Sequence, residues 1–223
     1  MAKRTAQQGL ASDSGSRPTA RPLDDESARL WDTAFDGAAR DLLNAAVQCF
    51  ASNGYHATTT RDISTRAGLS PAAMYVHFGS KELVLFEIVR TAHERALAEI
   101  RAGSTDATGN VTTRLSELVS RYTVWHARHH VAAKVAQFEL GGLAAAHYDE
   151  VLGLRRATGD VFRQVVTAGV RQGTFAVDEV SPVVRALLSL SIDLVRWYRL
   201  EDHDSPEELG RLYAELAVRM VRA

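Results

Sequence analysis

The 223-residue sequence has little cysteine, little net charge and no long apolar run. Cys49 is the only cysteine, which excludes an intrachain disulfide and a zinc site built from several cysteines. No stretch approaches the roughly 20 apolar residues that a membrane-spanning helix needs, and the first residues lack the apolar core of a secretory signal. We therefore expect a cytoplasmic protein with no membrane partner.

Basic and acidic side chains nearly balance, with 26 Lys and Arg against 27 Asp and Glu, for a formal net charge of −1. This balance excludes a bulk polycation, so any binding to nucleic acid must come from local placement of charge. The hydrophobic fraction of 46% and the charged fraction of 24% are typical of a globular protein. The length allows one large domain or two small ones.

The first 35 residues differ in composition from the rest. Residues 1 to about 22 are rich in Ser, Thr, Gly, Pro, Ala and Gln and carry four basic side chains against one acidic side chain. This composition predicts a disordered, mildly basic arm. The residues that follow, up to 35, include Trp31 and Phe35 and predict a short docked segment. Beyond them, apolar residues recur at helical steps and no β-hairpin signal is convincing, so the sequence predicts an all-α fold.

A helix-turn-helix pattern follows an amphipathic helix predicted over about 36–52. Thr59 can cap the second helix, with Asp62 three residues later in a weak form of the capping box. Ser70 followed by Pro71 is a strong helix start, and Gly68 lies in the short turn before it. The residues expected to pack these helices together are Ile63, Ala67, Leu69, Met74 and Phe78.

Helical periodicity continues to the end of the chain. A fourth helix is predicted from Lys81 to about Arg101, and the loop 102–110 is the best domain boundary, with Asn110 at the next helix start. Further breaks are expected near 129–131, 141–142, 172–182 and 201–206.

The last two predicted helices, 183–200 and 206–223, are unusually apolar. The first is apolar on nearly every side, and the second carries a continuous apolar seam of the kind that builds helix bundles. Burial of both helices between two subunits would account for this pattern. The alternative is a monomer that buries them internally.

Residues 38–89 closely resemble the N-terminal DNA-binding domain of the TetR/AcrR family of transcriptional regulators. The motifs that carry the resemblance are Phe50, Gly54-Tyr55, Thr58-Thr59, Asp62-Ile63, Ala67-Gly68-Leu69-Ser70, Tyr75, His77-Phe78 and Ser80-Lys81-Glu82-Leu83. The resemblance implies a three-helix DNA-binding domain over 36–82. It also implies an α-helical ligand-binding and dimerisation domain over 83–223, with the last two helices forming the dimer.

The second helix of a helix-turn-helix places its N-terminal residues against base edges in the major groove. The predicted DNA-binding residues are Thr59, Thr60, Arg61, Ser70, Pro71, Ala72, Tyr75, His77 and Lys81. The resemblance implies phosphate contacts for Thr59, Tyr75, His77 and Lys81. Ala72 and Ala73 stand where many members have Gly and Thr, which shifts the expected readout toward thymine methyl groups and DNA shape. The alternative is a plain helical hairpin, with Tyr75 and Phe78 in its core.

Aromatic and histidine side chains gather in the second half of the chain, as in small-molecule pockets. The predicted ligand-binding residues are Tyr122, Trp125, His129, Phe138, Phe162 and Trp197. Each of them alone could equally be a core or surface residue. His126, His129 and His130 form an H-x-x-H-H pattern, but no carboxylate or Cys lies at a matching offset, so we predict neither a metal site nor a cofactor.

Residues 191–216 weakly resemble regulators of steroid and fatty acyl catabolism, which commonly respond to acyl-CoA thioesters. The basic residues available for the CoA phosphates are Arg121, Arg128, Lys134, Arg155, Arg156 and Arg163. The alternative is a regulator of efflux or xenobiotic response with a drug-like ligand.

The leading hypothesis is a homodimeric repressor that binds a palindromic operator and is released by a small hydrophobic effector. The sequence contains no Gly-rich phosphate loop, nucleophile elbow or HExxH motif, so we predict no catalytic residues. An activator, or a DNA-binding protein without a ligand, is the remaining alternative. Residues 37–82 carry four basic against three acidic side chains, which predicts a shallow dependence of DNA binding on salt.

Overall fold

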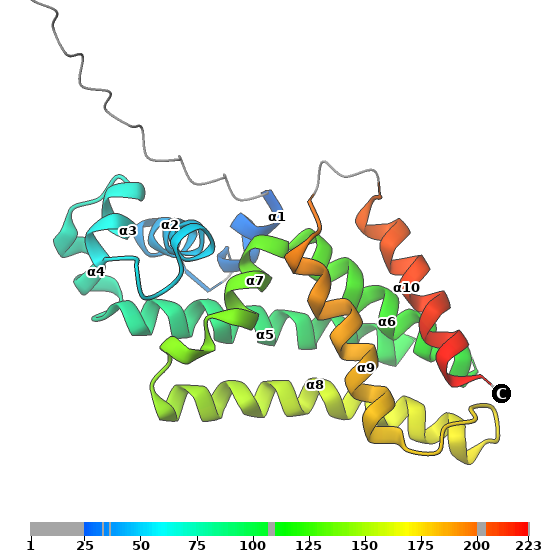
Figure 1. The fold of residues 1–223 in the computed structure, drawn as a ribbon. Helices are drawn as coiled ribbons and strands as arrows, with labels where there is room; N and C mark the ends of the chain where they lie inside the picture. Colours follow the sequence, from blue (N-terminus) through cyan, green and yellow to red (C-terminus); the bar gives the residue numbers. More distant parts are fainter. Residues whose placement is uncertain (1–24, 33, 36, 107–109, 200–203, 223) are drawn as a thin grey trace, which may run out of the picture.

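The computed structural model describes residues 25–222, apart from 33, 36, 107–109 and 200–203. These residues form ten α-helices and three 3₁₀ turns, and no strand occurs among them (Figure 1). The predicted all-α fold is confirmed. The basic arm predicted for residues 1–22 lies outside the described residues.

Three helices form a compact head at one end of the molecule (Figure 1). They are α2 (Gly37–Asn53), α3 (Thr60–Arg66) and α4 (Pro71–His77). The five predicted packing residues lie in or against the core that the three helices share. Cys49 is buried there too, and burial raises the pKa of its thiol. Cys49 is therefore a small apolar residue of the core of the head.

The long helix α5 (Lys81–Asp106) leads out of this head. Ser80 caps it, because its hydroxyl accepts a hydrogen bond of 3.1 Å from the N–H of Leu83. The helix runs past Arg101, where we expected it to end. Gly103 is packed so closely on Arg121 that a Cβ atom there would lie 2.4 Å from the Cδ of Arg121. Close packing on the next helix thus outweighs the weak helix propensity of this stretch.

Five further helices complete the second domain. They are α6 (Val111–Arg128), α7 (His130–Phe138), α8 (Ala145–Arg171), α9 (Val180–Asp193) and α10 (Pro206–Val221), with the 3₁₀ turns η2 (Leu140–Gly142) and η3 (Leu194–Arg196). Asn110 caps α6 as predicted. In Figure 1, α8 runs along α5, and α9 and α10 lie at the end away from the head. None of the described helices is both long and apolar enough to cross a membrane.

The prediction of one continuous helix over 183–200 is wrong in its second half. Helix α9 ends at Asp193, and the chain tightens into η3 before Trp197 and Tyr198. This change buries the ring of Tyr198 completely, in a cluster with Leu194 and Leu209. The hydroxyl of Tyr198 also donates to the carbonyl oxygen of Asp204. Tertiary packing of one aromatic ring therefore overrides the helical pattern of the sequence.

A short N-terminal segment connects the head to the second domain. It consists of α1 (Asp25–Ala28) and the turn η1 (Arg29–Trp31). Trp31 is fully buried, and its indole N–H donates to the side-chain oxygen of Asn44 on α2 at 2.7 Å. Glu26 pairs with Arg128 on α6 at 3.6 Å. The segment thus contacts both parts of the protein.

Candidate DNA-binding surface and effector cavity

Helices α3 and α4 form the predicted helix-turn-helix. The hydroxyl of Thr59 accepts the N–H of Asp62 at 3.1 Å, and the carboxylate of Asp62 accepts the N–H of Thr59 at 3.0 Å. This reciprocal pair is the capping box that the sequence predicted. Gly68 has a φ of 70° in the turn, where a residue with a side chain would be strained. Ser70 begins α4 without using its hydroxyl as a cap.

Most of the predicted DNA-binding residues are exposed around the start of α3 and along α4. Thr59, Arg61, Ser70, Pro71, Ala72, Tyr75 and His77 are exposed, and Thr60 and Lys81 are half-buried. Tyr75 is 57% exposed, and its hydroxyl lies 3.4 Å from that of Thr60. Phe78, in contrast, belongs to the core. Tyr75 therefore has no packing role in the head, and its ring is available to a partner.

Val76 is a residue of this surface that the sequence reasoning missed. It is 79% exposed, between the exposed Tyr75 and His77. In the sequence, Val76 lies off the apolar stripe that Met74 and Phe78 form on α4, and this position indicates an exposed side chain. A branched apolar side chain on a recognition helix presents methyl groups, which suit contact with the methyl group of thymine.

Lys81, for which we predict a phosphate contact, also binds the backbone of the head. Its ammonium donates to the carbonyl oxygens of Tyr55 at 2.8 Å and Thr58 at 2.7 Å, and it lies 4.2 Å from the centre of the Tyr55 ring. Burial lowers the pKa of this ammonium. Two of its three N–H donors thus hold the turn before α3, so Lys81 supports the DNA-binding surface from behind.

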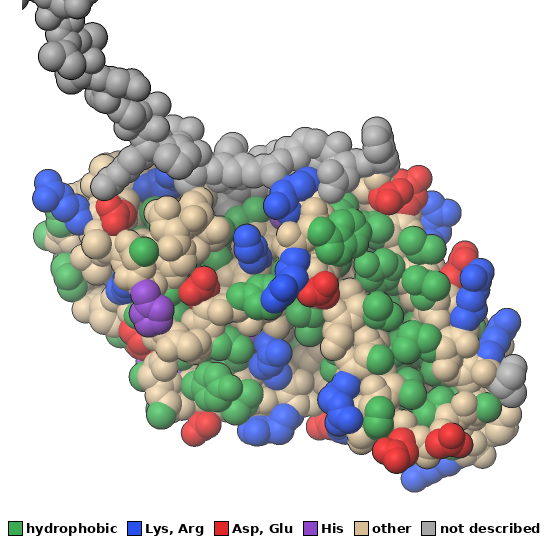
Figure 2. Space-filling model, viewed as in Figure 1, with side chains coloured by type: hydrophobic (Ala, Val, Ile, Leu, Met, Phe, Trp, Pro, Cys, Tyr) green, Lys and Arg blue, Asp and Glu red, His purple; other side chains and the backbone are tan. Residues whose placement is uncertain are grey.

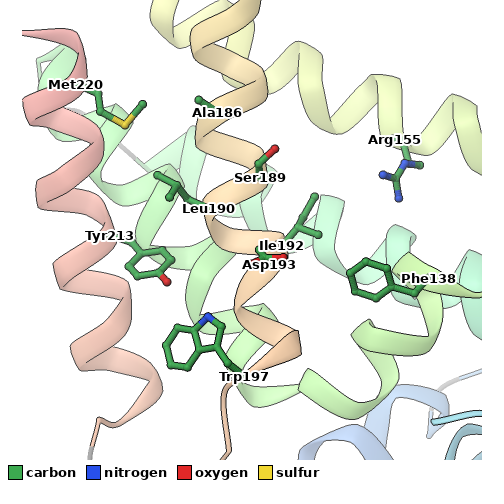
Figure 3. A pocket seen from close by; sticks show the side chains of 10 residues that line it. All are labelled: Phe138, Arg155, Ala186, Ser189, Leu190, Ile192, Asp193, Trp197, Tyr213 and Met220. Carbon is green, nitrogen blue, oxygen red and sulfur yellow. The ribbon is translucent and has the colours of Figure 1, made fainter.

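Two adjoining cavities lie in the second domain. The larger, which we call the outer bowl, has a volume of about 690 Å³. It is lined by Phe138, Arg155, Ala186, Ser189, Leu190, Ile192, Asp193, Trp197, Tyr213 and Met220 (Figure 3). The smaller, the inner chamber, has a volume of about 240 Å³ and is lined by His93, Tyr122, Gln137, Arg155, Thr158, Arg185, Leu188, Ser189 and Ile192. Arg155, Ser189 and Ile192 line both.

Arg155 lies where the two cavities meet. Figure 3 shows its side chain reaching from α8 toward Phe138 and Ile192. One terminal nitrogen donates to the side-chain oxygen of Gln137 and to Nε2 of His93, the latter at 3.3 Å. Among the described residues, no carboxylate pairs with this guanidinium.

His93 is neutral in this arrangement. Burial lowers the pKa of its imidazole to about 4, aided by the positive charge of Arg155, while the hydrogen bond to Val89 acts in the opposite direction. Its Nδ1 donates to the carbonyl oxygen of Val89 at 2.8 Å. Nε2 is therefore left with a lone pair that accepts from Arg155.

Three of the six predicted ligand-binding residues line these cavities, namely Tyr122, Phe138 and Trp197. Trp125, His129 and Phe162 do not line either cavity, which departs from our expectation. Phe162 is fully buried and packs edge-on against Tyr122, with ring centres 5.5 Å apart. Trp125 stacks on His129 at 4.9 Å. Phe162 thus supports the ring of Tyr122, and its residue type alone does not distinguish this role from lining the cavity.

The H-x-x-H-H histidines use Nδ1 on backbone carbonyl oxygens. His126 donates to Tyr122 at 2.8 Å, His129 to Trp125 at 3.0 Å and His130 to Ala127 at 3.2 Å. Within the described part of the chain, no group of three His, Cys, Asp or Glu side chains could hold a metal ion. Nε2 of His126 is buried with no hydrogen-bond partner there.

Two known protein families match parts of the chain. The bacterial regulatory proteins of the tetR family match residues 42–88, and the tetracyclin repressor-like C-terminal domain matches residues 108–221. The chain belongs to the TetR family. It is therefore a transcriptional regulator and not an enzyme.

Several relatives of this TetR-family regulator cover nearly its whole length. The transcriptional repressor KstR2 of Rhodococcus jostii is 30% identical over 90% of this chain and 96% of its own. The crystal structure of a tetR-family regulatory protein from Rhodococcus RHA1 is 35% identical, with a TM-score of 0.80 over 85% of this chain and 99% of that one. The ketosteroid transcriptional regulator KstR2 of Mycobacterium tuberculosis is 27% identical, with a TM-score of 0.77 over 85% and 97% of the two chains.

The connection between α7 and α8 joins the effector domain of this regulator to its DNA-binding head. The carboxylate of Glu82, in the first turn of α5, accepts the N–H of Ala144 and Nδ1 of His147, each at 2.8 Å. His147 also stacks on Phe86, with ring centres 3.9 Å apart. The start of α5, next to the head, is thus fixed to the start of α8.

Proposed function

We propose that this TetR-family regulator is a homodimeric repressor that binds a palindromic operator through α3 and α4 and is released by an apolar small molecule. The observation that carries the DNA-binding part is the exposed row Tyr75, Val76 and His77 on α4. These side chains cover no core, although Tyr75 and Val76 are large and hydrophobic. Such exposure at the C-terminal end of α4 suits contact with DNA beside the base edges, which the N-terminal residues Ser70, Pro71 and Ala72 would face.

The dimer is supported by an apolar surface on α9, α10 and the turn between them. Its members are Leu190, Trp197, Leu212, Leu216 and Met220, each between 37% and 48% exposed. Figure 2 shows hydrophobic side chains gathered over these elements. On α10 the exposed residues recur every four positions, which is one face of a helix. A second copy of the same face would cover them by two-fold symmetry and would also close the outer bowl, because Leu190, Trp197 and Met220 line it as well.

The effector is an apolar molecule with a polar end, because the walls of both cavities are mostly apolar and the inner chamber adds polar side chains such as Gln137 and Arg155. A lipid or steroid catabolite, free or as an acyl-CoA thioester, is the class to test first. The weak resemblance of residues 191–216 and the similarity to KstR2, a ketosteroid regulator, support this class. A drug-like xenobiotic is the second candidate, favoured by the size of the outer bowl alone.

The positions of the basic residues restrict where an acyl-CoA could place its phosphates. Of the six that the sequence offered for CoA phosphates, Arg155 alone lines the two cavities. Arg121 pairs with Glu99 and Glu117, Arg128 with Glu26 and Glu207, and Arg163 with Asp160. An acyl-CoA would therefore hold its phosphates outside these cavities.

The effector weakens operator binding only as far as it prefers the conformation that does not bind DNA. We expect α5 to move in this change, because it begins in the head and its residue His93 lines the inner chamber. Two recognition helices in a dimer must lie about one DNA turn, roughly 34 Å, apart. A small rotation of α5 in each subunit changes this spacing.

Selection of operator DNA from a random pool by the purified full-length protein tests the proposal. The expected result is a palindrome whose affinity falls by about tenfold or more when Tyr75 is changed to Ala, since base and phosphate contacts contribute about 1–3 kcal/mol each. Arg163→Gln, an exposed change on α8, is the matched control and should have no effect. A selected site without two-fold symmetry, or full affinity in the Tyr75 variant, would contradict the proposal.

A further inference from the structure

The inner chamber contains hydrogen-bond donors that the described residues leave without acceptors. The guanidinium of Arg155 donates to neutral partners only, through one of its terminal nitrogens. Tyr122 lines the same chamber, and its hydroxyl has no hydrogen-bond partner among the described residues. Burial raises the pKa of this phenol, so the hydroxyl keeps its proton. The chamber therefore offers two kinds of donor, and it carries the positive charges of Arg155 and of Arg185, which also lines it.

A cationic group in such a place is costly unless an anion joins it. Arg155 is half-buried, and the imidazole beside it is neutral because burial holds the pKa of His93 near 4. Other arginines of the second domain are paired with carboxylates, as Arg121 is with Glu99 and Glu117. Arg155 has no such pair among the described residues, although it lines both cavities. Its missing partner is then an anion supplied from outside the chain.

We propose that the inner chamber binds the carboxylate of an apolar carboxylic acid, held by Arg155 and Tyr122, with the body of the acid in the outer bowl. This inference rests on the effector site proposed above and names its ligand class. The planar guanidinium fork matches a carboxylate in geometry as well as in charge. A chamber of about 240 Å³ holds a carboxyl group and its first carbons. Phe138, Leu190 and Trp197 then surround the remaining chain.

With its carboxylate on Arg155, the acid fits the inner chamber in a way that its CoA ester cannot. A thioester replaces the carboxylate by a neutral group and attaches a nucleotide too large for the inner chamber. A CoA ester of the same acid therefore cannot place its acyl head on Arg155. The free acid is the form that the chamber selects.

Calorimetric titration of the full-length protein with decanoate and with methyl decanoate tests this inference without DNA. We expect decanoate to bind once per subunit and at least about tenfold more tightly than its ester, since a hydrogen bond to a charged group contributes about 1.5–3 kcal/mol. Arg155→Gln should remove this preference by weakening decanoate about tenfold or more while leaving the ester unchanged. Tyr122→Phe keeps the buried ring, removes only the hydroxyl and should weaken decanoate by a smaller factor.

Arg163→Gln is again the control, because Arg163 lies on the same helix, is exposed and pairs with Asp160. It should bind decanoate like the unmodified protein. Equal affinity for acid and ester, an unaltered preference in both cavity variants, or no binding of decanoate would each overturn the inference. Loss of operator binding has no bearing on these titrations, so failure of the proposed repressor function would be seen separately.

Discussion

The carboxylate of Glu139 accepts a hydrogen bond of 3.1 Å from the backbone N–H of Tyr55, which joins the effector domain to the DNA-binding head. Glu139 directly follows Phe138, which lines the outer bowl. Gly142 packs on the ring of Tyr55 so closely that a Cβ atom there would lie 2.5 Å from it. Lys81 holds the carbonyl oxygen of Tyr55 from the other side. Phe138, in the wall of the outer bowl, is thus followed directly by Glu139, which binds the turn that precedes α3.

Removing this contact should loosen the start of α3. Glu139→Ala leaves the N–H of Tyr55 without its acceptor, so we expect the free energy of unfolding to fall by about 1–3 kcal/mol. Operator affinity should fall a few-fold, because the turn positions Thr59 and the first turn of α3. Glu139→Gln retains an acceptor oxygen and should lose less on both counts. Urea unfolding and operator titration measure the two effects.

Glu150→Ala, an exposed change on α8, controls for the loss of a negative charge and should behave like the unmodified protein. If Glu139→Ala matched this control in both measurements, the contact would have no role in positioning the head.

The local elements of the fold were predictable because short-range chemistry determines them. Thr59 with Asp62, and Ser70 with Pro71, start helices by cap chemistry that acts over three or four residues. Gly68 and Asn110 likewise occupy the positions that their conformational preferences suggest. The exposure of Tyr75 was also predictable, because Met74 and Phe78 mark the side of α4 that faces the core.

The inner chamber was only partly predictable because it is assembled from five helices, α5 to α9. His93 and Gln137 lie far apart in the sequence, and only the packing of α5, α7 and α8 brings both to Arg155. Phe162 has the residue type of a pocket wall but lies behind it, against the ring of Tyr122. Helix α9 ends early for a comparable reason, since the burial of Tyr198 depends on α6 and α10.

Lys81 and Arg61 should differ in how they affect the salt dependence of operator binding. Lys81→Met removes two hydrogen bonds to backbone carbonyl oxygens and should lower the free energy of unfolding by about 1–3 kcal/mol with little change in the salt slope. Arg61→Gln removes an exposed charge near the DNA and should reduce the slope by about 1 at nearly constant stability. Operator titrations between about 50 and 200 mM salt measure the slopes. An equal loss of slope in both variants would assign Lys81 a direct phosphate contact.

The apolar face of α10 should hold the two subunits of the dimer together. Leu216→Arg places a charge in the centre of the proposed dimer interface, where it would be desolvated without a partner. We expect a monomer by sedimentation equilibrium and operator affinity lower by more than about tenfold, since half of the contacts are lost. Glu215→Lys is the matched control, because Glu215 is exposed on the neighbouring flank of α10 beside Thr112 and Thr113. A dimer that survived Leu216→Arg would assign dimerisation to another surface.

Two buried histidines should make the protein less stable in mild acid. Burial lowers the pKa of His93 to about 4 and that of His126 to about 3, from an ordinary value of 6.5. Below about pH 6.5 the unfolded chain binds these protons and the folded protein does not, so stability falls as the pH falls toward 4. The effect is about 1.4 kcal/mol per pH unit for each group, and above pH 6.5 it vanishes because both states are neutral.

A single substitution separates this effect from the titration of carboxylates. His126→Phe replaces a ring whose Nε2 has no partner among the described residues, so stability at about pH 7 should change by less than about 1 kcal/mol. Between about pH 7 and pH 5, the loss of stability should be about half that of the unmodified protein, because one of two proton-binding groups is gone. Urea unfolding at the two pH values measures the difference, with His56→Gln, an exposed change, as the control. An unchanged pH dependence in His126→Phe would mean that His126 is protonated, or exposed to water, in the folded protein.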